Sequence, residues 1–118
     1  MEESERYELL KVEYLKKTIS EALRVSERCH EILFRNTYDK KNELIAATYL
    51  NKAISLISQA KAIYISNIEI LEKSEVEEIF IKFHTFESEF LSNLSTDHSH
   101  QWTGTEFTNF KNSVDNFI

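Results

Sequence analysis

The chain has 118 residues, with no proline, one glycine and 42% hydrophobic residues. A domain of this length buries roughly two thirds of the surface that its unfolded chain exposes, and a chain almost without proline and glycine has few places where a helix must stop. We therefore expect one all-α domain over residues 1–118. The net charge of −6 falls mainly after residue 68, where ten acidic residues accompany three basic ones, and this argues against nucleic acid as a partner.

The first ten residues, MEESERYELL, are acidic and do not resemble a signal peptide, and the lone Cys29 has no second cysteine to pair with. Lys52, Lys61 and Glu69 interrupt the longest apolar segment, which is then too short for a membrane span. We expect a soluble, cytoplasmic protein with no membrane contact.

The first predicted helix runs from about Ser4 to Phe34. Its seam positions, apolar except for one serine, follow the alternating spacing of 3 and 4 that is typical of a heptad seam. They are Val12, Leu15, Ile19, Ala22, Ser26, Cys29 and Leu33. Residues 36–39 (Asn-Thr-Tyr-Asp) form the first break, with Asp39 as the expected N-cap of the next helix.

The second predicted helix ends near Leu71 and is apolar on two sides. One stripe contains Ala46, Leu50, Ala53, Ile57, Ala60, Tyr64 and Leu71, and the other contains Ile45, Tyr49, Leu56, Ile63 and Ile70. A helix that is apolar nearly all round is enclosed by other elements. We expect this segment to be the central helix of a bundle.

A third helix is predicted from Glu75, because Ser74 and Glu77 match a capping box. Its seam is Val76, Ile79, Phe83, Phe86, Phe90 and Leu94, with Phe80 beside it. The polar segment 95–101 is predicted to be a loop. Thr103, or else Thr105, is the expected cap of a short fourth helix with Phe107, Phe110, Val114 and Phe117 on one face, and Trp102 and Phe107 fit a hydrophobic staple.

These elements predict an up-down four-helix bundle with two long antiparallel helices, a medium third helix and a short fourth helix. Two arrangements remain open. Either the shorter helices cover the whole apolar length of the long pair, or a second copy of the chain covers the rest in a homodimer.

Two groups of residues raise the question of a metal, and we expect none to be bound. Glu27 and His30 have the Glu-x-x-His spacing of di-iron bundles, but no second pair of this kind exists in the chain. Asp97, His98 and His100 crowd the predicted loop but have no cysteine nearby, so we interpret them as a polar loop without a cofactor.

Arg24 and His30 are separated by five residues. This arrangement resembles the motif of the HEPN superfamily of small helical ribonucleases and their inactive relatives. The resemblance implies that the two side chains act on a scissile phosphate across a dimer, and it gives the alternative hypothesis of an RNA-cleaving enzyme. In this chain, however, the pair lies within the first helix rather than late in the sequence.

Two further features are interpreted as core. Cys29 occupies a seam position, where a free thiol behaves as a small hydrophobe. The aromatic run from Phe80 to Phe117 is typical of core packing, although a pocket for an apolar ligand between helices remains a second alternative.

The function we expect is non-catalytic, through contacts with a protein partner. That partner is a second copy of the chain or a basic surface. Trp102 is the expected anchor of this contact, and Glu75, Glu77 and Glu78 form the expected acidic steering patch.

Overall fold

The computed structural model describes residues 3–35, 40–96 and 100–118. These residues form five helices: α1 (Glu3–Arg35), α2 (Lys40–Ser66), α3 (Ile68–Leu71), α4 (Ser74–Thr96) and α5 (His100–Phe117). No strand is present in these ranges. The prediction of an all-α protein is confirmed.

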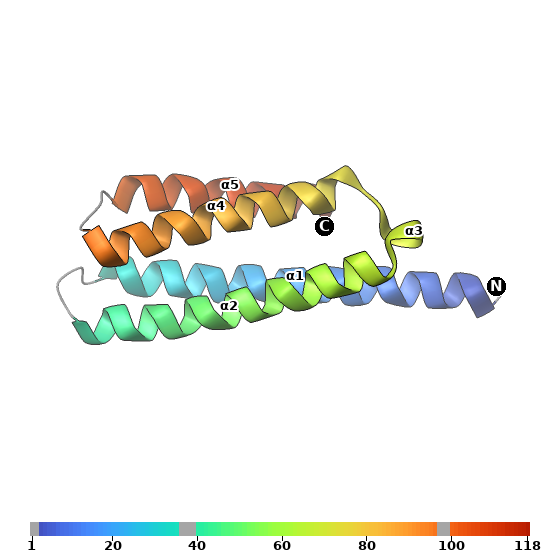
Figure 1. Ribbon diagram of the computed structural model, residues 1–118, viewed down its shortest axis with the longest axis horizontal. Helices are drawn as coiled ribbons and strands as arrows, with labels where there is room; N and C mark the ends of the chain where they lie inside the picture. Colours follow the sequence, from blue (N-terminus) through green and yellow to red (C-terminus); the bar gives the residue numbers. More distant parts are fainter. Residues whose placement is uncertain (1–2, 36–39, 97–99) are drawn as a thin grey trace.

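The helices lie along one long axis (Figure 1). α1 packs along α2 and α4 packs along α5, and the two pairs meet chiefly where α1 contacts α5, with a smaller contact between α2 and α4. The molecule measures 56 × 22 × 19 Å and has a radius of gyration of 15.7 Å. A compact domain of this length has a radius of gyration of about 13.5 Å, so this chain is a rod.

The core lies where the predicted stripes face one another. The entire first stripe of the second predicted helix, from Ala46 to Leu71, is buried. In α1, α4 and α5 the predicted seams supply most of the other core residues. They are Leu15, Ile19, Ala22, Ser26, Cys29, Val76, Ile79, Phe83, Phe86, Phe90, Phe110 and Val114. Helical periodicity therefore identified most of the core, although it missed Val25 and Ile32 of α1.

The second apolar stripe of α2 is covered only in part. Tyr49, Leu56 and Ile63 pack half-buried against the core, whereas Ile45, and Ile70 in the following turn, are exposed. Complete enclosure of the central helix, as expected from its composition, is not what the structure shows.

The prediction that the second helix continues to Leu71 is wrong, because the helix breaks at Asn67. The Asn67 side-chain amide donates to the carbonyl of Ile63 at 2.9 Å, and its backbone amide donates to Tyr64 at 3.2 Å. A short polar side chain that binds the backbone in this way competes with helical hydrogen bonding. The single turn α3 follows and carries Leu71 into the core.

The predicted starts of the last two long helices also need correction. α4 begins at Ser74, one residue before the predicted start at Glu75. The carbonyl of Lys73 accepts hydrogen bonds from the backbone amides of Val76 at 3.1 Å and Glu77 at 3.4 Å. Ser74 therefore lies in the first turn and is not the cap.

α5 begins at His100, so neither Thr103 nor Thr105 caps it, and the predicted loop over 95–101 is too long at both ends. The helix passes through Gly104, where an added Cβ atom would meet the Nε2 atom of His30 at 3.7 Å, an ordinary contact. Packing against α1 thus compensates for the weak helix propensity of this segment. The expected cap Asp39 and the break at 36–39 lie outside the described residues.

Within the described ranges, none of the helices combines the length and apolar character needed to cross a bilayer.

Candidate functional site

The N-terminal part of α1 extends beyond α5. Lys16 places its ammonium group 5.6 Å from the ring centroid of Phe117, the last residue of α5. The part of α1 that precedes Lys16 projects past the C-terminal end of α5 (Figure 1). This projecting segment carries four exposed apolar side chains, Tyr7, Leu9, Leu10 and Tyr14.

Three of these side chains share one face of the helix. Tyr7, Leu10 and Tyr14 are 56%, 56% and 61% exposed and follow one another at spacings of 3 and 4. We call them the outer stripe. Leu10 and the core residue Ile19 are nine residues apart, so their side chains project about 180° apart. Leu10 therefore points away from the core. Tyr7 lies eleven residues before the buried Thr18 and so projects within about 20° of it, beyond the point where α5 ends.

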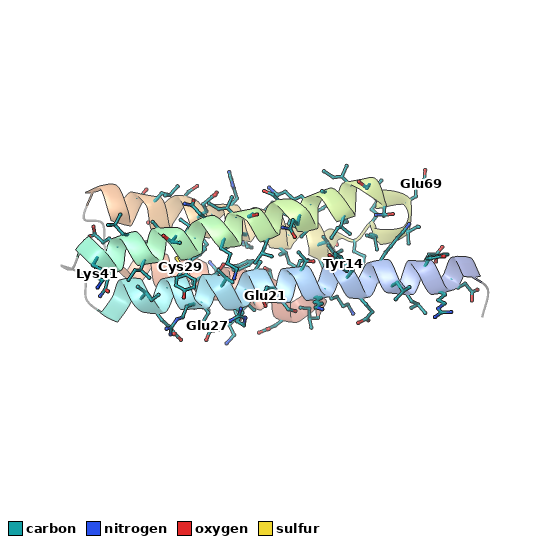
Figure 2. The ribbon with its side chains drawn as sticks, turned by 90° about the horizontal axis from the view of Figure 1, so that it is seen from below. Tyr14, Glu21, Glu27, Cys29, Lys41 and Glu69 are labelled. Atoms are coloured by element: carbon teal, nitrogen blue, oxygen red, sulfur yellow. The ribbon has the colours of Figure 1, made fainter. Side chains whose placement is uncertain are left out.

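Figure 2 views the face that α1 and α2 form in front of α4 and α5, and it labels Tyr14 there. The outer stripe borders an open groove with a volume of about 610 Å³. Leu10, Tyr14 and the exposed C-terminal Ile118 contribute its apolar wall, and Glu13, Lys16, Lys17 and Ser20 complete it. A surface with apolar residues beside a groove and charges at its edge is typical of a protein contact site.

Sequence reasoning missed the outer stripe because the stronger seam of α1 contains Val12 and Leu15 and accounts for the helix by itself. The signal was present in the sequence as Tyr7, Leu10 and Tyr14, which have heptad spacing on a face where a surface helix normally carries charges.

The structure places the predicted partner-binding residues at opposite ends of the α4–α5 pair. Trp102 is 61% exposed in the first turn of α5. Glu75, Glu77 and Glu78 are exposed in the first two turns of α4, whose start lies at the other end of the α4–α5 pair (Figure 1). These residues therefore do not form one compact site.

Arg24 and His30 are also not brought together. Arg24 is on the surface, where its Nε atom donates to Glu21 at 3.1 Å and lowers the pKa of that carboxyl group. His30 is half-buried and its ring stacks on Phe107 of α5, with centroids 5.0 Å apart and an angle of 11° between the planes. Six residues apart on one helix, the two side chains project about 120° from each other.

We expect the substitution His30→Ala to lower the free energy of unfolding by about 1–2 kcal/mol, because it removes the stacking on Phe107 and the area buried with it. Urea unfolding followed by circular dichroism measures this loss, and Arg24→Ala, on the exposed face, should change stability by less than about 0.5 kcal/mol. RNA cleavage by the unmodified chain that disappears in His30→Ala would instead support the HEPN-like alternative.

Cys29 lies in the core, as predicted. Its thiol is inaccessible and donates to the carbonyl of Ala46 at 3.2 Å. Burial raises the pKa of the Cys29 thiol to about 12. A reactive thiolate needs exposure and nearby positive charge, so this cysteine is a packing residue.

No three histidine, cysteine, aspartate or glutamate side chains come together as a metal site in the described part of the chain. Glu27, of the Glu-x-x-His pair, is exposed to solvent. Asp97 and His98 lie outside the described residues, as does the side chain of His100.

The aromatic run packs against itself. The Phe86 ring lies 5.9 Å from Phe90, 5.6 Å from Phe107 and 6.3 Å from both Phe83 and Phe110, measured between centroids. A cavity beside Leu15, Leu71 and Phe117 has a volume of about 20 Å³, which is room for about one water molecule. These contacts support the interpretation of the aromatic residues as core.

Comparison of the chain with models of known protein families, with curated proteins and with solved structures gave no match.

Proposed function

We propose that this chain is a non-catalytic helical-bundle protein that acts through protein–protein contacts, and that its first partner is a second copy of itself. In this proposal α1, α2, α4 and α5 constitute an up-down four-helix bundle. The contacts of α1 with α2 and α5, and of α4 with α5 and α2, support that arrangement.

The observation that carries the proposal is the outer stripe on the projecting part of α1. Tyr7, Leu10 and Tyr14 keep more than half of their surface in water, and Leu10 and Tyr14 line a groove. Tyrosine is enriched in protein interfaces because it combines a large apolar ring with a polar tip. A rod that leaves such residues uncovered at one end is stabilised when a partner covers them.

A second contact surface is proposed for a different partner. Trp102 is the anchor of this surface, because a large exposed aromatic residue buries more area than any other side chain when a partner covers it. Glu75, Glu77 and Glu78 steer a basic surface toward the far end of α4, mainly by increasing the association rate. The distance between these two features implies that the partner contacts them separately or lies along the whole α4–α5 pair.

The self-association is tested by light scattering after size-exclusion chromatography, over a tenfold range of protein concentration. We expect a mass of about 28 kDa, twice the 13.9 kDa chain, that falls toward 13.9 kDa as the protein is diluted. A mass that stays at 13.9 kDa up to several hundred micromolar would overturn the proposal that the chain is its own partner.

A further inference from the structure

We propose that two copies of the chain pair antiparallel through the outer stripe of α1, with Leu10 on the two-fold axis. This inference rests on the self-association proposed above and specifies its geometry. The occupant of the groove beside Leu10, Tyr14 and Ile118 is then the N-terminal part of α1 from the second copy.

One pair of charges beside the stripe favours the antiparallel direction. Arg6 and Glu13 are seven residues apart and therefore lie on the same flank of the outer stripe. When two identical helices pair antiparallel about a two-fold axis, the same flank of each helix meets, whereas in a parallel pair opposite flanks meet. Antiparallel pairing thus places Arg6 of each copy beside Glu13 of the other, and the symmetry makes this contact twice.

The apolar residues obey the same symmetry. Tyr7 precedes Leu10 by three residues and Tyr14 follows it by four. With Leu10 opposite its own copy, Tyr7 of one chain lies over Tyr14 of the other. That position is at the groove of about 610 Å³, whose wall includes Tyr14 and Ile118. The groove therefore lies where this pairing places the Tyr7 ring of the second copy.

The area available fits a dimer of moderate strength. Tyr7, Leu10, Tyr14 and Ile118 are each more than half exposed, and their burial removes roughly 400 Å² per copy from water. The aliphatic stems of Arg6, Glu13 and Lys17 add to this area. The total stays below the ~800 Å² per partner of a standard interface. We expect a dissociation constant in the micromolar range, because in a small interface the favourable free energy of the contacts only slightly exceeds the entropic cost of association.

Disulfide cross-linking tests the position of the axis. A cysteine at a residue on a two-fold axis meets its own copy, and a disulfide forms when the two Cβ atoms come within about 4.5 Å. We expect Leu10→Cys to give a covalent dimer on mild oxidation at least tenfold faster than Leu91→Cys. Leu91 is 49% exposed on α4, which makes it a matched control, and the native Cys29 is buried and remains unreactive.

A charge exchange tests the direction. Arg6→Glu places two acidic groups opposite each other at both contacts, and we expect it to raise the dissociation constant about five- to tenfold. The double variant Arg6→Glu with Glu13→Arg restores opposite charges and should return the dissociation constant to within about twofold of the original.

The outcomes separate this inference from the proposal on which it depends. A chain that is monomeric at every concentration overturns the self-association itself. A dimer in which Leu10→Cys cross-links no faster than Leu91→Cys, or in which the double charge exchange restores nothing, overturns the antiparallel pairing and leaves the self-association in place.

Discussion

Replacing Phe86 with alanine is expected to lower the free energy of unfolding by about 3–5 kcal/mol. Phe86 is fully buried and its ring contacts those of four other phenylalanines, two on α4 and two on α5. Removing the ring leaves a cavity where these helices meet, and the surrounding rings cannot collapse into it without losing contacts of their own. Since small domains have only about 5–15 kcal/mol of stability, the variant should be close to unfolding at 37 °C.

Chemical unfolding with urea, followed by circular dichroism, measures this loss. Leu91→Ala is the control, because Leu91 lies on the same helix with half of its surface in solvent, and its loss should stay below about 1 kcal/mol. A loss below about 1.5 kcal/mol for Phe86→Ala would mean that the aromatic residues line a space instead of filling the core, and it would favour the apolar-ligand alternative.

Stability should also fall steeply in alkaline solution because of Cys29. The ordinary pKa of the thiol is 9.0, and burial raises it to about 12 in the folded chain. The folded state therefore keeps this proton between pH 9 and pH 12 while the unfolded state loses it. Below pH 9 this thiol does not change the free energy of unfolding. Above pH 9 it lowers that free energy by up to about 1.4 kcal/mol per pH unit, or about 4 kcal/mol by pH 12.

The variant Cys29→Ala isolates this contribution, because it lacks the titrating thiol. Its unfolding free energy should decline less between pH 9 and pH 10.5 than that of the unmodified chain, by about 2 kcal/mol. Burial also raises the pKa of Tyr64, and this contribution is common to both proteins and cancels in the difference. Equal slopes for the two proteins would show that Cys29 reaches solvent in the folded state.

The core could be predicted from the sequence because burial follows helical periodicity. The stripe from Ala46 to Leu71 is buried throughout, as its spacing predicts, and Phe83, Phe86 and Phe90 follow the same rule in α4. Helix ends were harder to predict, because they depend on single hydrogen bonds. Asn67 breaks a helix without any glycine or proline, through a bond from its side chain to Ile63.

The candidate site could not be predicted because it depends on where neighbouring helices end. Tyr7 and Tyr14 are exposed since α5 reaches α1 only near Lys16 and Phe117, and nothing in the local pattern around Tyr7 encodes that limit. The capping pattern at Thr103 and Thr105 misled the prediction in the same way: it suggested the start of a helix, whereas the structure places both residues within α5. Tertiary packing decides both features.

The most direct test of the account is the solution mass of Leu10→Glu beside Leu91→Glu, measured by light scattering at concentrations where the unmodified chain is dimeric. A carboxylate on the two-fold axis faces its own copy, and like charges in contact there should dissociate the dimer. We predict a mass of 13.9 kDa for Leu10→Glu and about 28 kDa for Leu91→Glu. A dimeric Leu10→Glu would contradict the central claim that the projecting end of α1 is the surface through which this protein associates.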